Sequence, residues 1–457
     1  MTLDVIILAA GQGSRMKSTC PKVLHRIGHQ SLLKHVLDLA TSLGADSTTV
    51  VYGHGGDQVL NALGHLDVHW VEQKERLGTG HAVMQAEQFF DVSSQVLILY
   101  GDVPLLKKAS VEALLARGRA SGFGLMTVSL EDPKGYGRIV RDEHGFVQKI
   151  VEEKDASSQE KAIHEVNTGI LVVEGEKLGR WLHQIKNQNA QGEYYLTDIV
   201  EMAVKEGVEI QTTQPGKEAE VLGVNDRSQL AYLERIYQND LAQSLLHQGV
   251  TLRDPSRLDI RGDLPLVGVD VELDVNIILQ GRVQLGDRVR VGANTIIRDS
   301  IIGDDCEILP NTVIEEATIG SGARIGPFAR IRPGTDLGTH THVGNFVEIK
   351  KSRIAEGSKV NHLSYIGDAQ VGSKVNIGAG TITCNYDGVN KHQTVIGDGA
   401  FIGSSSQLVA PVVVGENATI GAGSTITKEA PADFLTLSRS KQVTIESWVR
   451  PRKSKET

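Results

Sequence analysis

Two glycines and two cations near the start of the chain could bind a phosphorylated ligand. The run LAAGQGSRM occupies residues 8–16 and directly follows an apolar segment. Gly11 and Gly13 let the backbone approach a ligand, the NH groups of a helix starting there can bind phosphate, and Arg15 and Lys22 add positive charge. A lone GxG is often an ordinary turn, and the third glycine of a dinucleotide fingerprint is absent. The paired cations favour a triphosphate.

An acidic residue closes a second apolar segment. Asp102 ends VLILYGD, residues 96–102, which is typical of a buried strand. Open α/β sheets bind ligands at the carboxyl ends of their strands, and a carboxylate there can share Mg²⁺ with phosphate oxygens. Taken alone, Asp102 could equally be a helix cap or a turn residue. Together with the glycine turn, it indicates a magnesium–nucleotide site.

A third group of polar residues lies beside a break in the repeating pattern of the C-terminal half. The sequence CNYDGVNKHQ, residues 384–393, interrupts a regular pattern and predicts an external loop. His362 precedes it in the run HLSY, and a neutral imidazole can act as a base near pH 7 because its ordinary pKa is ~6.5. Most histidines in a chain are structural, so this residue needs further support.

The segment 1–225 predicts an α/β domain that would position the glycine turn. Strand-like segments at 5–10, 48–53, 69–73 and 96–102 alternate with helical patterns at 31–44, 57–64 and 80–90. This alternation predicts a parallel sheet with helices on both faces. The segment 226–249 forms a linker in which apolar side chains recur every three or four positions, so we expect one amphipathic helix that caps the next domain.

The segment 250–457 is a further domain with a C-terminal tail, and it follows a six-residue period as far as Pro431. Aliphatic–glycine pairs recur, as in the glycines at 397, 403, 415 and 421. Such hexapeptide repeats predict a parallel β-helix with three short strands per coil, and hexapeptide helices as a family coil left-handed. The pattern ends after Pro431, and we expect the basic tail RPRKSKET to be solvated.

The composition is that of a soluble globular protein. The 457 residues include 47 basic and 56 acidic side chains, for a net charge of −9, which argues against a nucleic-acid-binding surface. Three scattered cysteines predict neither disulfides nor a zinc finger. No export signal or membrane span is predicted, so we expect a cytoplasmic protein.

The order of motifs resembles one enzyme family over essentially the whole chain. LAAGxGxRM, PK, LGTGHA, YGDVPL, GYGRI, VEEKD, NTGI and GVND follow one another as in N-acetylglucosamine-1-phosphate uridyltransferases. With the hexapeptide domain attached, the chain resembles the bifunctional uridyltransferases and glucosamine-1-phosphate acetyltransferases. The resemblance implies a Rossmann-like nucleotidyltransferase domain followed by a left-handed β-helix, and a role in precursor synthesis for peptidoglycan and lipopolysaccharide.

The resemblance also implies roles for individual residues of the first domain. Arg15 and Lys22 would act on the triphosphate, and Asp102 with Asn225 would hold Mg²⁺. Residues implied to bind UTP or the UDP-sugar are Leu8, Ala9, Ala10, Gly11, Lys22, Gln73, Gly78, Thr79, Tyr100, Gly101, Asp102, Gly137, Glu152, Asn167 and Asn225.

In the second domain the resemblance makes His362 the base that deprotonates the glucosamine amino group, with Glu348 as a candidate to orient it. Residues implied to bind the sugar phosphate are Arg332, Lys350, Tyr365 and Asn376. Residues implied to bind acetyl-CoA are Ala379, Asn385, Tyr386, Ser404, Ala422 and Arg439, with Asn385 and Tyr386 also holding the sugar and the loop. The resemblance further implies a homotrimer with shared active sites, acting on small molecules.

Three alternatives stay open at this point. The β-helix could be a purely structural or regulatory module, which would leave a single-activity sugar-1-phosphate nucleotidyltransferase. The sugar could be glucose rather than an acetamido sugar. His340 and His342 lie on one strand face and, with His362, could form a zinc site like that of a γ-class carbonic anhydrase.

Overall fold

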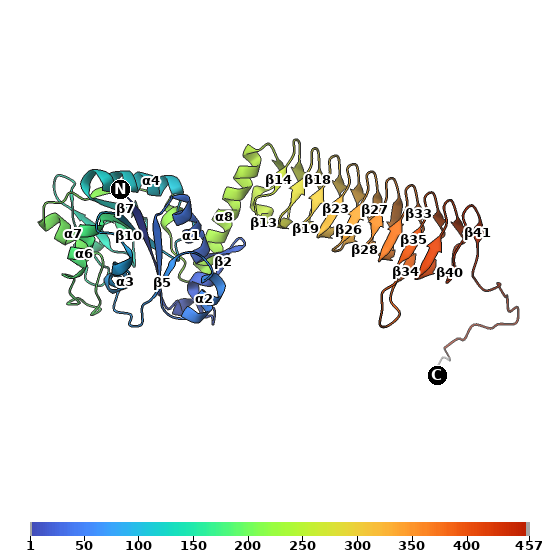
Figure 1. Cartoon of the computed structure of the whole chain (residues 1–457), viewed down its shortest axis with the longest axis horizontal. Helices are drawn as coiled ribbons and strands as arrows, with labels where there is room; N and C mark the ends of the chain where they lie inside the picture. The colour runs from blue at the N-terminus through green and yellow to red at the C-terminus, as the bar shows by residue number, and fades with distance from the viewer. Residues whose placement is uncertain (1, 454–457) are drawn as a thin grey trace. The chain divides into compact units, whose positions relative to one another are not determined.

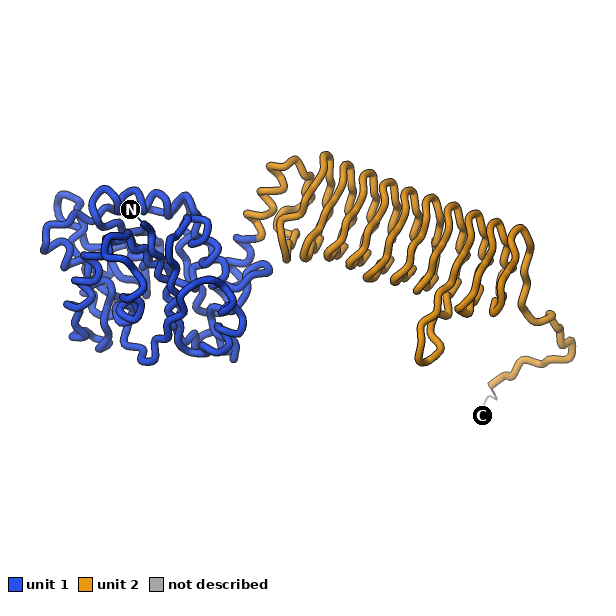
Figure 2. Tube along the Cα trace, in the orientation of Figure 1, with its two compact units in different colours: residues 1–237 blue, residues 238–457 orange. Residues whose placement is uncertain are grey.

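A computed structural model describes residues 2–453, so residues 454–457 of the predicted basic tail lie outside the described residues. The chain divides into two units, Met1–Tyr237 and Gln238–Thr457 (Figure 2). The division falls inside helix α8 (Arg227–His247), where the sequence predicts a single helix. Among the described residues, no helix combines the length and apolar character needed to span a membrane.

The first unit is built on one mixed sheet with strand order β11-β7-β10-β6-β1-β4-β5, and the hairpin β8-β9 joins it at β10. The strands are β1 (Leu3–Ala9), β4 (Ser47–Tyr52), β5 (His69–Glu72), β6 (Gln95–Tyr100), β7 (Phe123–Ser129), β8 (Arg138–Arg141), β9 (Val147–Val151), β10 (Glu165–Glu174) and β11 (Gln211–Thr213), with a separate short pair β2 (Arg26–Ile27) and β3 (Gln30–Ser31).

The prediction of a parallel sheet is correct for the strands that carry the glycine turn and wrong for two others, β9 and β10. Strand β1 runs parallel to β4 and β6, but β10 runs antiparallel to both β6 and β7. The hairpin β8-β9 reverses the direction of the chain before it enters β10. The hairpin therefore explains the reversed strand.

Helices cover both faces of this sheet, as predicted (Figure 1). Val5 and Ile7 of β1 enter one core with side chains of α1, α2 and α4, whereas Ile6 and Leu8 enter a second core with α3, α6 and α7. This alternation follows from the two-residue period of a strand. The helices are α1 (Leu32–Ser42), α2 (Gly56–Leu63), α3 (Thr79–Gln85), α4 (Lys108–Ser121), α5 (Ser158–Lys161), α6 (Gly175–Leu182) and α7 (Asp198–Lys205), with short 3₁₀ turns η1 (Ser14–Met16), η2 (Lys22–Leu24), η3 (Glu87–Phe89), η4 (Glu218–Val221) and η5 (Pro255–Arg257).

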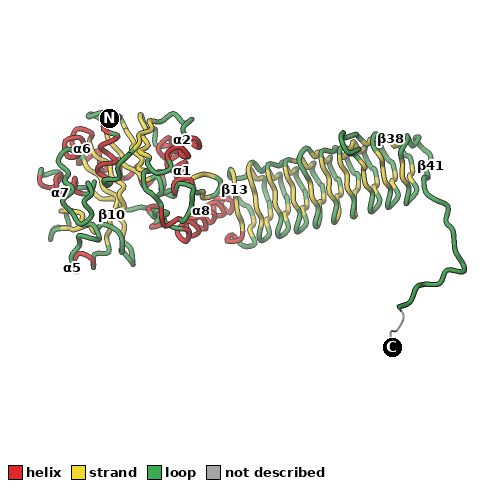
Figure 3. The backbone as a smooth tube through the Cα atoms, turned by 90° about the horizontal axis from the view of Figure 1, so that it is seen from below, coloured by secondary structure: helices red, strands yellow, loops and turns green. Residues whose placement is uncertain are grey.

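The second unit is the predicted left-handed parallel β-helix, whose short strands form three parallel ladders (Figure 3). The first ladder contains β12 (Thr251–Leu252), β15 (Glu272–Leu273), β18 (Arg290–Val291), β21 (Glu307–Ile308), β24 (Arg324–Ile325), β27 (His342–Asn345), β30 (Lys359–His362), β33 (Asn376–Ile377), β36 (Phe401–Ile402), β39 (Thr419–Ile420) and β41 (Leu435–Thr436). The second contains β13 (Leu258–Gly262), β16 (Ile277–Gly281), β19 (Ile296–Arg298), β22 (Val313–Glu315), β25 (Arg330–Ile331), β28 (Glu348–Lys350), β31 (Tyr365–Gly367), β34 (Ile382–Cys384), β37 (Gln407–Val409) and β40 (Thr425–Ile426). The third contains β14 (Leu266–Val267), β17 (Gln284–Leu285), β20 (Ile301–Ile302), β23 (Ala317–Ile319), β26 (Thr335–Leu337), β29 (Arg353–Ile354), β32 (Ala369–Val371), β35 (Thr394–Ile396) and β38 (Val412–Val414).

Stacked aliphatic side chains fill the prism. Ile314, Ile331 and Ile349 follow one another on the second ladder and are fully buried. Helix α8 closes the first coil, because Gln238 donates to the Ile260 carbonyl (2.9 Å) and accepts from the Ile260 NH (2.7 Å). Ala242 and Leu245 of the same helix join the prism core.

One coil is longer than its neighbours, as the interrupted repeat predicts. On the third ladder Arg353 pairs with Gln370, and Gln370 pairs with Val395, so the second of these two coils contains more of the chain than the first. The additional residues form the excursion near 385–392 that leaves the prism (Figure 1). Within it, Tyr386 and Lys391 form an antiparallel bridge. The break in the hexads therefore marks an external loop.

Candidate active sites

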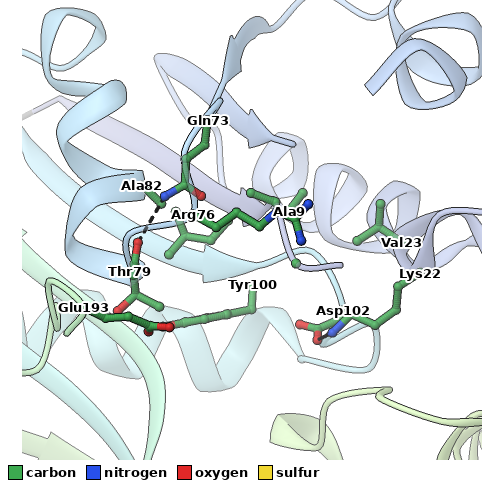
Figure 4. A pocket seen from close by; sticks show the side chains of 14 residues that line it. Ala9, Lys22, Val23, Gln73, Arg76, Thr79, Ala82, Tyr100, Asp102 and Glu193 are labelled. Atoms are coloured by element: carbon green, nitrogen blue, oxygen red, sulfur yellow. Dashed lines mark hydrogen bonds and ion pairs between the residues drawn. The ribbon is translucent and has the colours of Figure 1, made fainter. Parts of the chain in front are cut away.

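A cleft of about 330 Å³ opens at the carboxyl ends of strands β1, β5 and β6 (Figure 4). These strands end at the same edge of the sheet because β1, β4, β5 and β6 all run parallel. Ten residues that the sequence resemblance assigns to the nucleotide line the cleft: Leu8, Ala9, Ala10, Gly11, Lys22, Gln73, Gly78, Thr79, Tyr100 and Asp102. Val23, Arg76, Ala82 and Glu193 also line it and were not predicted.

The glycine turn sets the position of Lys22. Gly13 has a φ of 63°, and a Cβ placed on it would lie 2.6 Å from the Cβ of Lys22. The predicted helix after this turn is wrong, because only the 3₁₀ turn η1 forms before Lys17 adopts a left-handed conformation. Arg15 lies exposed on that turn and is not part of the cleft wall. Of the paired cations, the lysine is the one that enters the cleft.

Asp102 and Asn225 converge on the same cation. The Lys22 ammonium forms an ion pair with Asp102 and lies 3.3 Å from Oδ1 of Asn225. The Val224 NH donates to the Asp102 carbonyl over 2.9 Å, so the loop that carries Asn225 is tied to the end of β6. Two oxygens from distant parts of the chain therefore meet at a point already suited to positive charge.

The opposite wall of the cleft is held by backbone contacts. The Gln73 amide donates to the Gly78 carbonyl over 3.1 Å, and the Leu196 NH donates to the Thr79 hydroxyl over 3.1 Å. Gly78 has a φ of 107°, and a Cβ on it would meet the Tyr194 carbonyl at 2.6 Å. Glycine is needed here because both the backbone angle and the space exclude a side chain.

Gly137, Glu152 and Asn167 form a second group, outside the cleft wall. The Asn167 NH donates to the Gly137 carbonyl over 2.8 Å, and a Cβ on Gly137 would contact the Glu152 carboxylate. Glu152 accepts from the Thr197 hydroxyl over 3.1 Å, and burial raises the pKa of this carboxyl. Burial likewise raises the pKa of Tyr100. Gly101 lies behind the wall, where its NH donates to the Leu8 carbonyl.

A cationic group lies on the prism beside the external loop. Arg332 donates to Glu348 over 2.7 Å, and within residues 2–453 the hydrogen-bond partner of the His362 ring is Asn345 rather than Glu348. The neighbouring Lys391 ammonium, more than burial, lowers the pKa of Lys350. Two ammonium groups held together in this way are typical of a site for an anion. Lys391 was not predicted.

One corner of the prism carries His362 together with several residues assigned to acetyl-CoA. Backbone NH groups of residues 363, 380, 405 and 423 donate to the carbonyls of Asn345, His362, Ala379 and Ser404 in turn, over 2.7–3.2 Å. The Ala422 carbonyl ends this corner column and accepts from Arg439 over 3.0 Å. The structure thus stacks His362, Ala379, Ser404 and Ala422 on successive coils, with only small side chains after the histidine.

The remaining predicted residues lie apart from this corner. Tyr365 is on β31, its ring lying over Gly367, and Gly367 is paired with Lys350. Asn376 pairs with Lys359, at the other end of the strand from His362. Asn385 donates to Asp368 at the base of the loop, and Tyr386 is exposed on it. A single chain therefore does not bring all of these groups together.

The three histidines of the zinc alternative do not gather at one point within the described part of a single chain. Within residues 2–453, no three His, Cys, Asp or Glu side chains gather in a way that could hold a metal ion. His362 Nδ1 instead lies 2.8 Å from Oδ1 of Asn345. Burial, more than the nearby Arg324 and Lys359, lowers the pKa of His342.

Comparisons with known proteins cover both units. A MobA-like NTP transferase domain matches residues 5–164, and bacterial transferase hexapeptide repeats match residues 299–331, 316–351 and 393–428. The chain is 61% identical to the bifunctional protein GlmU of Methylococcus capsulatus over 455 residues, which cover 100% of the chain and 99% of the relative. It is 56% identical to the Ralstonia pickettii protein, with 99% of both chains covered, and 54% identical to that of an Azoarcus species, with 99% of this chain and 100% of the relative covered.

Proposed function

The chain belongs to the family of bifunctional GlmU proteins, and from this we propose that its two units carry out the two steps of UDP-N-acetylglucosamine synthesis. The second unit transfers acetyl from acetyl-CoA to glucosamine 1-phosphate. The first unit then joins N-acetylglucosamine 1-phosphate to UTP and releases pyrophosphate. The observation that carries the proposal is the identity of 54–61% to relatives that span both units. The product is a precursor of cell-wall polymers.

Uridylyl transfer needs positioning and charge neutralisation rather than a nucleophile from the protein. A phosphate oxygen of the sugar phosphate attacks the α-phosphorus of UTP, and the bond from that phosphorus to the pyrophosphate oxygen breaks in line. Gln73 and the backbone from Leu8 to Gly11 bind the uridine, while Lys22 neutralises the phosphates. Arg15 joins them from its exposed turn. Glu152 and Asn167 bind the sugar, supported by their closeness to Gly137.

We assign Mg²⁺ to Asp102 and Asn225. The fit is supported by the two oxygens that meet around the Lys22 ammonium, since a site that already holds one cation has the donor set for another. Magnesium keeps several ligands as water or phosphate oxygen, so two protein ligands suffice. When bound, it neutralises charge on the phosphates. With the ion held there, Lys22 would be free to pair with the phosphates instead of Asp102.

Acetyl transfer uses His362 as the base. Its Nε2 takes a proton from the amine of glucosamine 1-phosphate while the nitrogen attacks the thioester carbonyl. The carbon–sulfur bond then breaks, and the proton passes to the leaving CoA thiolate. Arg332, Lys350 and Lys391 bind the sugar phosphate, and the corner column of small residues offers a flat path for the acyl carrier toward His362.

We further propose a homotrimer in the cytoplasm, where UTP and acetyl-CoA are available. Asn376 and His362 lie at opposite ends of their ladder strands, which supports a site completed by a neighbouring copy. Three exposed apolar side chains also support the proposal that a neighbouring copy covers this corner: Phe328, Phe346 and Leu363. They are 50%, 56% and 64% exposed at φ values of 55°, 56° and 48°, where bulky side chains are strained.

Two variants of the full chain test the assignment. Asp102→Ala abolishes uridylyl transfer and leaves acetyl transfer intact, whereas His362→Ala does the reverse. The assay of acetyl transfer incubates labelled glucosamine 1-phosphate with acetyl-CoA. The assay of uridylyl transfer supplies labelled N-acetylglucosamine 1-phosphate directly, with UTP and Mg²⁺, and in both assays one component is omitted at a time and the products are separated.

Each failure has a defined meaning. A wild-type protein that consumes no acetyl-CoA would identify the β-helix as a structural or regulatory module. Preference for glucose 1-phosphate over the acetamido sugar would identify a different nucleotidyltransferase. Near-normal uridylyl transfer by Asp102→Ala would reject the magnesium site, and a fully active monomer in sedimentation would reject shared sites.

A further inference from the structure

Asn345 lies one coil before His362 in the corner column. The two residues are paired across β27 and β30, and the NH of residue 363 donates to the Asn345 carbonyl over 3.1 Å. Their side chains meet as well, with His362 Nδ1 2.8 Å from Asn345 Oδ1. An amide oxygen can only accept, so the proton of the neutral imidazole lies on Nδ1. Nε2 makes no hydrogen bond within the described residues.

We propose that Asn345 is a positioning residue that fixes the ring orientation and tautomer of His362, so that Nε2 presents its lone pair to the substrate amine. The inference rests on the proposed acetyl transfer. A neutral imidazole has one donor and one acceptor nitrogen, and only the acceptor can take a proton. In water the two tautomers interconvert and the ring rotates freely. The Asn345 amide removes both freedoms from a side chain that is otherwise exposed.

The choice of an amide over a carboxylate has a chemical reason. A carboxylate at this distance would stabilise the imidazolium and leave the base protonated at neutral pH, whereas an amide oxygen orients the ring without that charge. The other titratable and charged groups on the surrounding strands are His342 on β27, Lys359 on β30 itself, and Glu348, Arg332 and Tyr365 around the corner. Glu348 is already paired with Arg332, so no free carboxylate on these strands replaces Asn345.

The isosteric change Asn345→Asp separates positioning from a merely structural role. It keeps the acceptor and the shape but adds a negative charge beside Nδ1. A charge this close to an exposed imidazole raises its pKa by about one unit, the lower end of the usual range. The acid limb of kcat/KM for acetyl transfer therefore moves up by about one pH unit, while the plateau at high pH is retained.

Asn345→Ala removes the acceptor altogether. We expect kcat for acetyl transfer to fall about 10- to 100-fold, part of the factor of roughly 10²–10⁴ that a general base supplies, with KM for glucosamine 1-phosphate little changed. Uridylyl transfer by the same protein is the internal control. Asn294→Asp is the matched charge control. Asn294 lies three coils before Asn345, where its side chain accepts a hydrogen bond from that of Asn276.

The results decide between two separate failures. If the wild-type protein transfers no acetyl group, the proposed function is wrong. If it does, and Asn345→Ala keeps normal kcat, the positioning role is wrong. A fall in kcat for Asn345→Ala with an unshifted pH profile for Asn345→Asp also rejects the role, because it identifies Asn345 as a folding residue only.

Discussion

Replacing Gly13 with alanine tests how the glycine turn controls the cation of the nucleotide cleft. An alanine at a φ of 63° costs about 1–2 kcal/mol, and the loss of freedom in the unfolded chain returns about 0.4–1 kcal/mol. The net loss of stability is therefore only about 1 kcal/mol. The larger effect is on position, because the new Cβ would lie 2.6 Å from the Cβ of Lys22.

The displacement can be worked out from that contact. Carbon atoms separate to about 3.5 Å or more at van der Waals contact, so Lys22 must move by about 0.9 Å. The overlap is with the base of the lysine side chain, which cannot swing away as its tip could. A misplacement of about 1 Å in a group that positions a reaction costs about 100-fold in rate. We expect a loss of that size in uridylyl transfer, with acetyl transfer by the same protein unchanged.

Gly44→Ala is a matched control. Gly44 has a similar φ of 71°, but nothing lies within 4 Å of a Cβ placed on it. Both variants carry the same backbone strain, and only Gly13→Ala displaces Lys22. Kinetic assays of pyrophosphate release and chemical denaturation of both variants measure the two effects. Equal rates in the two variants would refute the reasoning.

Three further predictions concern other parts of the chain. Burial, Glu201 and Asp155 raise the pKa of Asp198 to about 6, so the folded state holds a proton that the unfolded state loses, and stability falls as pH rises from about 4 to 6. Asp198→Asn should flatten this dependence by about 1 kcal/mol in denaturation curves, since solvent screens the half-exposed carboxyl. Ile349→Ala, in the centre of the prism, should destabilise the second unit by about 2–5 kcal/mol toward urea. Lys391→Ala should raise KM for glucosamine 1-phosphate about tenfold with little change in kcat, while the exposed Lys374→Ala changes neither.

Each of these has a result that contradicts it. A slope between about pH 4 and 6 that Asp198→Asn leaves unchanged would show that this carboxyl titrates normally. A loss below about 1 kcal/mol for Ile349→Ala would mean that the prism closes around the cavity. An unchanged KM for Lys391→Ala would place the sugar phosphate away from the paired ammonium groups.

Much of the fold could be predicted because its side chains repeat with the backbone. The hexads are visible in the sequence because every coil buries the same kind of aliphatic residue, as in the stack of Ile331 and Ile349. The direction of β10 could not be predicted, because a buried strand has the same side-chain pattern whether its neighbours are parallel or antiparallel. The absence of a helix after Gly13 could not be predicted either. Lys17 ends the turn in a left-handed conformation, which its residue type does not suggest.

The candidate sites were predictable where chain position alone brings residues together. Asp102 reaches the cleft because parallel strands end at one edge of the sheet. Arg76 and Glu193 could not be predicted as cleft residues, because they lie in loops that reach the cleft wall. Asn345 was missed although a signal existed, since it stands one coil before His362 in the repeat. In a repeat of this kind, the position one coil before a candidate residue is therefore itself a candidate.

The length of the prism can change only in steps of one whole coil. In a stack of this kind each turn contacts only its neighbours, and consecutive turns lie about 4.8 Å apart. Duplicating the sequence of a single coil between β16 and β19 would therefore move the Gln238 cap one coil further from His362. The surroundings of both residues would stay the same. Length in this half of the molecule can change by gene duplication while its chemistry stays the same.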